Sequence, residues 1–113
     1  MLVFIGNREL SFDDVLVNTV NRVFMEVLGE TGASFVYCQL RRRHGLDRCL
    51  IPERIEPFGE VMIKLLGSGG EAILNMIVNG VAEELGVRPP RDRSLKFGAK
   101  LKIICDECEE IEF

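Results

Sequence analysis

Long hydrophobic runs are missing from this sequence, although 47% of its 113 residues are hydrophobic. The charged residues Arg22, Glu26 and Lys64 interrupt the apolar stretches, so none approaches the ~18 residues of a membrane-spanning helix. The apolar residues 1–5 lack both the basic region and the long apolar core of a secretory signal peptide. We therefore expect a cytoplasmic protein without a membrane partner, folded as a single domain over residues 1–113.

Residues typical of catalytic sites are also scarce. The chain contains one histidine and four cysteines, too few cysteines for the disulfide scaffold of a secreted protein. His44 has no acid or nucleophile at a fixed local spacing that would make it a catalytic base. The sequence contains no P-loop, nucleophile elbow, dinucleotide fingerprint or HExxH motif. We therefore expect a non-enzymatic protein without an organic cofactor.

Charge of one sign is concentrated locally in a chain whose net charge is −4. Arginines gather within residues 41–54 and again within residues 88–93. The candidate contact residues are Arg41, Arg42, Arg43 and Arg48 in the first cluster and Arg88, Arg91 and Arg93 in the second. Cations at the end of a helix are favoured by the helix dipole, and they could also contact an anion or a nucleic acid. The overall acidity argues against a dedicated nucleic-acid-binding protein.

A motif of the form Leu-Gly-x-x-Gly is present twice, at residues 28–32 and 66–70. Segments 28–40 and 66–78 superpose at an offset of 38 residues. Apolar residues recur at intervals of three and four on both sides of each motif, which predicts helices there. The sequence therefore predicts two helix–LGxxG–helix hairpins in a helical core over residues 11–87.

The ends of these helices carry recognisable signals. Ser11 and Asp14 have the spacing of an N-terminal capping box. Gly45 follows the second predicted helix, at about residues 33–44, and Gly86 follows the fourth, which ends at about residue 85. Both stand where C-terminal caps do. The fourth helix is apolar nearly all round, which predicts a central helix or one in an interface. Its Asn75 and Asn79 either face solvent or fix the register of a symmetric helix pair.

Alternation of apolar and polar residues predicts β-strands at both ends of the chain, over residues 2–10 and 95–113. The first would turn at Gly6-Asn7. In the second, a loop at 106–108 would place Ile103 opposite Ile111. The expected fold class is therefore mainly α (α+β), with four to five helices and a small antiparallel sheet formed by the N- and C-terminal strands.

Cys105 and Cys108 form a CxxC sequence, which can supply half of a tetrahedral zinc site. The set would be completed by Cys38, Cys49 or His44, or by the same pair from a second copy. Incidental thiols are the alternative. A redox role is less favoured, because an acidic loop would raise the pKa of the thiols.

Four stretches of the chain together resemble a known family: LGETGASFVYCQL, RRRHGL, IPERIEPFGEVMIKLLGSGGEAI and VAEELGV. They are similar to a small helical domain common in archaeal genomes, grouped among output domains attached to signalling modules. The resemblance covers about residues 20–87. It implies a helical fold and a regulatory or sensory role, and it brings no catalytic residues with it.

We therefore expect a non-enzymatic regulatory or interaction module, with a sensory output role, that forms a homodimer or binds a protein partner. One alternative is a nucleic-acid-binding regulator that uses the arginines of 41–43 and 88–93. The other is a small zinc-binding protein that uses Cys105 and Cys108.

Overall fold

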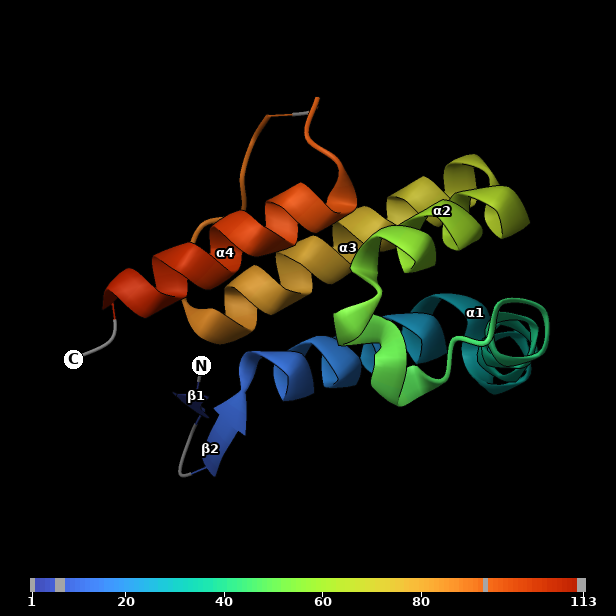
Figure 1. Ribbon diagram of the computed structural model, residues 1–113, viewed down its shortest axis with the longest axis horizontal. Helices are drawn as coiled ribbons and strands as arrows, with labels where there is room; N and C mark the ends of the chain where they lie inside the picture. Colours follow the sequence, from blue (N-terminus) through green and yellow to red (C-terminus); the bar gives the residue numbers. More distant parts are fainter. Residues whose placement is uncertain (1, 6–7, 93, 112–113) are drawn as a thin grey trace.

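The computed structural model describes residues 2–5, 8–92 and 94–111, with side chains described over 11–92 and 94–108. Strands β1 (Leu2–Ile5) and β2 (Arg8–Ser11) pair antiparallel, with Leu2 opposite Ser11. Helical elements make up most of the rest (Figure 1). They are α1 (Phe12–His44), the 3-10 helix η1 (Arg48–Glu53), α2 (Ile55–Leu66), α3 (Ser68–Leu85) and α4 (Phe97–Ile111).

Helix α1 begins at the predicted capping box and bends sharply in its middle. The Ser11 hydroxyl accepts a hydrogen bond from the Asp14 N–H at 3.1 Å, and the Asp14 carboxylate accepts one from the Ser11 N–H at 3.3 Å. The bend lies at Gly29, whose φ of 73° and ψ of 175° are open to glycine only. A straight helix of 33 residues would be about 50 Å long, whereas the longest dimension of the molecule is 41 Å. In Figure 1 the first arm lies across the view and the second is seen nearly end-on.

The second LGxxG motif makes a similar corner between α2 and α3. Gly67 has φ 60° and ψ −130°, so the chain again turns at the first glycine of the motif. The second glycine, Gly70, is buried, and a Cβ there would overlap the backbone of Met62. Both copies of the motif therefore turn the chain at one residue, as the repeat predicts, although the break is shorter than a loop.

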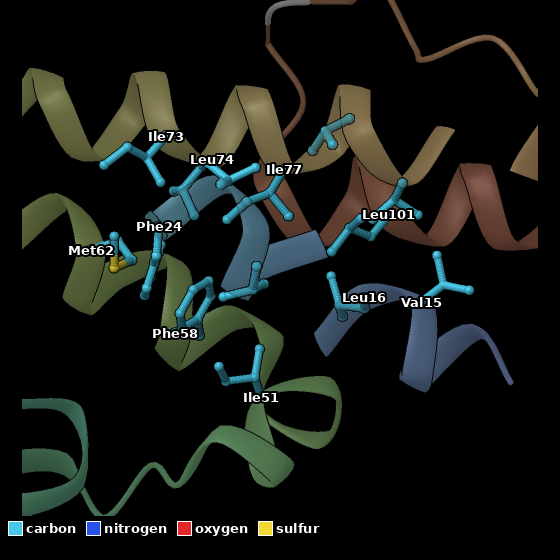
Figure 2. Packing of buried hydrophobic residues seen from close by; sticks show 14 of the residues in the cluster. Val15, Leu16, Phe24, Ile51, Phe58, Met62, Ile73, Leu74, Ile77 and Leu101 are labelled. Carbon is cyan, nitrogen blue, oxygen red and sulfur yellow. The ribbon is translucent and has the colours of Figure 1, made fainter. Parts of the chain in front are cut away.

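Helix α3 lies in the centre of the fold and contacts α1, α2 and α4, which confirms the prediction of a central helix. It lies close to α1 at Gly80, where a Cβ would lie 2.8 Å from the Thr19 methyl group. Figure 2 shows the core between these helices, with Phe24 and Phe58 facing Ile77 of α3. The rings of Phe24 and Phe58 lie 6.3 Å apart. The core therefore joins both LGxxG corners in one packed unit.

The predicted C-terminal strand is wrong, because residues 97–111 form helix α4. The predicted loop at 106–108 and the pairing of Ile103 with Ile111 are wrong for the same reason. Leu101, Ile104 and Cys108 recur at helical spacing and are all buried. The sheet that would join the two chain ends is therefore not formed by the described residues. Gly6, Asn7, Glu112 and Phe113, also part of the predicted strands, lie outside the described residues.

Candidate functional sites

The predicted arginine cluster lies at the C-terminal end of α1. Arg41, Arg42 and Arg43 occupy its last turn and are exposed, as is His44. Gly45 follows in the left-handed conformation, with φ 62° and ψ 24°, and ends the helix as predicted. The N–H of Gly45 donates to the Arg41 carbonyl at 3.1 Å, so this carbonyl is capped by backbone. The arginines stand where cations are favoured by the helix dipole.

Two of the four predicted arginines come together around a tyrosine. Arg41 and Arg48 both line a hollow of about 350 Å³, which we call the Tyr37 hollow. Its lining residues are Val17, Tyr37, Arg41, Asp47, Arg48 and Cys49. Both arms of the bent helix α1 contribute to it, together with the chain that leads into η1. Arg42 and Arg43 do not line this hollow.

The geometry of Tyr37 fixes one of these arginines in place. The Arg48 Cζ lies over the Tyr37 ring, 4.3 Å from its centroid, which is a cation–π arrangement. The Tyr37 hydroxyl donates to the Asn21 Oδ1 at 3.2 Å, and its ring packs 5.1 Å from that of Phe24. Burial raises the pKa of Tyr37 above its ordinary value of 10.0, while the positive charge of Arg48 opposes this rise.

Tyr37 was not predicted as a site residue. A signal existed, because Tyr37 and Arg41 are spaced i to i+4 and share one face of the helix. Nothing in the sequence indicated that η1 would bring Arg48 over the ring.

A second concave surface lies where α4 begins on the α2–α3 pair. We call it the α2–α4 groove, and it has a volume of about 380 Å³. Its apolar lining includes Ile55, Gly59, Ile63, Leu74, Leu95 and Phe97. A Cβ at Gly59 would lie 3.5 Å from the Phe97 ring, so α4 starts in close contact with α2. In Figure 1 the α2–α3 pair extends beyond the start of α4. The groove therefore opens where α4 stops covering the pair.

The charges around this groove are separated by sign. Glu56, Glu60 and Glu71 come from α2 and α3, whereas Lys96 and Lys100 come from α4 and the turn before it. The Lys100 Nζ donates to the Asn75 Oδ1 at 3.2 Å. Asn75 and Asn79 are both exposed in this chain. One wall of the groove is therefore acidic and the other is basic.

The turn before α4 is held by a local side chain. The Asp92 Oδ1 accepts hydrogen bonds from the Ser94 N–H at 2.9 Å and from the Ser94 hydroxyl at 2.6 Å. These bonds lower the pKa of Asp92. They stabilise the turn that carries Lys96 to the groove.

The predicted zinc ligands lie on α4. Cys105 is half-buried and Cys108 is buried, and their i to i+3 spacing places both on one face of a helix instead of in an acidic loop. Cys49 and His44, proposed to complete the set, are exposed near the end of α1, and Cys38 is half-buried. Within the described residues, no three or more His, Cys, Asp or Glu side chains are grouped so that they could hold a metal ion. Zinc binding by a CxxC pair shared between two copies stays a prediction.

The second arginine cluster follows α3. Gly86 ends that helix as predicted, with φ 71° and ψ 26°. Arg88 and Arg91 are exposed, and Arg93 lies outside the described residues. None of the helices in the described part of the chain combines the length and hydropathy of a membrane span.

Comparison of the chain with known protein families, with curated proteins and with solved structures finds no match.

Proposed function

We propose that this protein is a non-enzymatic regulatory or interaction module that acts by self-association. The α2–α4 groove is the observation that supports this most directly. Its apolar lining includes Ile63, a side chain that is 49% exposed. Exposed apolar side chains gathered in a concave surface are typical of interaction sites. The resemblance to an archaeal output domain agrees with a regulatory role.

The distribution of charge favours a second copy of this chain as the partner. In a two-fold symmetric dimer each copy uses the same surface, so residue i of one meets residue j of the other and the reverse. A groove with acids on one wall and lysines on the other satisfies this symmetry. The acidic wall of each copy would face the basic wall of its partner, and both pairings would be attractive.

The test is the concentration dependence of the molar mass, followed by sedimentation equilibrium of purified protein. We expect a monomer–dimer equilibrium, and we expect Ile63→Ser to weaken the dimer by about tenfold or more. One buried aliphatic side chain contributes about 1.5–3 kcal/mol, and 1.4 kcal/mol is a factor of ten. Met76→Ser is the matched control, because Met76 is 41% exposed on α3 and does not line the groove.

Two outcomes would contradict the proposal. A wild-type chain that stays monomeric at every concentration tested would exclude self-association. A dimer weakened equally by both substitutions would exclude the α2–α4 groove as the interface. Circular dichroism of each variant shows that its helices are intact.

A nucleic-acid-binding role is the second candidate, and the exposure of Arg41, Arg42 and Arg43 at one helix end favours it. Binding through such residues would weaken steeply with salt, because phosphate contacts release counterions. If the protein does not shift the electrophoretic mobility of DNA or RNA at low salt, this candidate function is excluded.

A further inference from the structure

The Tyr37 hollow has the size and chemistry of a small-ligand site that self-association does not use. Its volume of about 350 Å³ lies in the usual range of small-molecule sites. Its position, between the two arms of α1 and the start of η1, is away from the α2–α4 groove, and the two share no lining residue.

Arg48 is held ready to bind. Its guanidinium rests on the Tyr37 ring, and the ring is held by the Asn21 hydrogen bond and by Phe24. A long side chain that is already ordered loses less entropy when it binds a ligand. A guanidinium has five N–H donors, so contact with the ring leaves donors that can bind an anion.

Neither Arg41 nor Arg48 forms an ion pair with a residue in the described part of the chain. The one ion pair found there joins Arg22 to Glu26 at 3.5 Å on the outside of α1. The carbonyls of Arg41 and Leu40 accept hydrogen bonds from the N–H groups of Gly45 and Leu46. The hollow therefore holds two guanidiniums and the single acid Asp47, which leaves an excess of positive charge. A phosphate group accepts hydrogen bonds from both guanidiniums.

Asp47 narrows the choice of ligand further. Asp47 lines the same hollow, and an ionised carboxylate only accepts hydrogen bonds. It would repel a bare anion, but it would accept hydrogen bonds from hydroxyl groups attached to the same ligand. The lining thus combines two sites for phosphate oxygens with one site for hydroxyl donors.

We propose that the Tyr37 hollow binds the phosphate monoester of a small polyhydroxylated molecule, with Arg41 and Arg48 on the phosphate and Asp47 on the hydroxyls. This site is independent of the proposed self-association, so each can fail without the other.

The chain carries its own probe for this site, because Tyr37 is the single tyrosine and there is no tryptophan. Tyrosine fluorescence therefore reports on the hollow alone. With ribose 5-phosphate we expect a saturable change in fluorescence at millimolar concentrations or below. With ribose, which has the hydroxyls without the phosphate, we expect none.

Three arginine substitutions distinguish a specific site from general attraction to a basic surface. Arg41→Gln and Arg48→Gln should each weaken ribose 5-phosphate binding about tenfold or more, whereas Arg42→Gln should change it less than about twofold. Arg42 is the matched control, since it is exposed in the same run but does not line the hollow. Asp47→Ala should lower the affinity for ribose 5-phosphate relative to that for inorganic phosphate, because it removes both the acceptor for the hydroxyl groups and the repulsion of the phosphate.

The proposal is overturned if ribose 5-phosphate causes no saturable change in either fluorescence or titration calorimetry. It is equally overturned if Arg42→Gln costs as much affinity as the other two arginine variants. If Arg48→Gln disrupts the fold around the hollow, Arg48→Lys provides a second measurement. Lysine retains the positive charge but lacks the planar guanidinium.

Discussion

Tyr37 is the residue whose environment can be measured most directly. Burial raises its pKa above 10.0, and the charge of Arg48 over its ring limits that rise. Replacing Arg48 with Gln removes the opposing charge, so we expect the pKa of Tyr37 to increase further. Ultraviolet absorbance of tyrosinate during an alkaline titration gives this pKa without interference, because the chain has no other tyrosine. Arg42→Gln should leave the pKa unchanged, and an equal increase in that variant would contradict a specific role for Arg48.

The same pKa implies a pH dependence of stability. The folded chain retains the Tyr37 proton to a higher pH than the unfolded chain, which loses it near 10.0. The contribution of Tyr37 is therefore complete below that pH and is lost as the pH rises from 10.0 through the folded-state pKa. In a Tyr37→Phe variant this part of the alkaline destabilisation should be absent.

For individual residues, the sequence identified the charged side chains but not the groups that they contact. The clustering of arginines made Arg41, Arg42, Arg43 and Arg48 equal candidates for an anion contact, with a role at the helix end as the alternative. The selection of Arg41 and Arg48 over Arg42 and Arg43 depends on the direction of each side chain at the helix end and on the path of η1. Neither is encoded in a local pattern.

Among the elements, the corner between α2 and α3 depends on two glycines for different reasons. Gly67 supplies a backbone conformation, whereas Gly70 supplies space, because a Cβ there would lie 2.7 Å from the Met62 carbonyl carbon. Gly70→Ala should therefore destabilise the protein by roughly 1–3 kcal/mol, the usual cost of overpacking. Gly69→Ala is the matched control, since its nearest neighbour is the Leu66 Cβ at 4.0 Å. By reducing the freedom of the unfolded chain, it should be neutral or stabilise by about 0.4–1 kcal/mol.

Urea denaturation of the two variants measures this difference. Equal unfolding free energies for Gly70→Ala and Gly69→Ala would mean that the helices do not approach as closely as the corner requires.

The helices were predictable where local signals agreed with the packing. The capping box at Ser11, the stops at Gly45 and Gly86 and the two corners all follow from such signals. Helix α4 was not predicted, because the apolar run from Ile103 to Cys105 is compatible with either period. The choice was made by tertiary structure, since the α2–α3 pair exposes an apolar surface that the Leu101 and Ile104 face of a helix covers.

For the whole molecule, the distribution of charge has more consequences than the net value. Most of the acids lie outside the arginine clusters, and three of these acids line one wall of the α2–α4 groove. Lys96 and Lys100 form the opposite wall only because α4 is a helix that starts at Phe97. The sequence indicated self-association from the apolar surface of α3, yet α3 is largely covered within one chain. The α2–α4 groove is the candidate interface instead of the α3 surface. The sequence could not predict this groove, because the groove depends on the position of α4.

A charge exchange tests whether the two walls meet across a dimer. Glu60→Lys places like charges opposite each other at both symmetric contacts, so we expect it to weaken the dimer about tenfold. The double variant Glu60→Lys with Lys96→Glu restores opposite charges at both contacts and has the net charge of the wild type, so most of the affinity should return.

Glu83→Lys is the control for net charge, because Glu83 is exposed on α3 outside the groove. Sedimentation equilibrium at low and high salt measures all four proteins. Because exposed pairs are screened, the differences should shrink as salt increases. If the double variant is as weak as Glu60→Lys alone, the acidic and basic walls do not face each other, and the two-fold arrangement is wrong even if the protein dimerises.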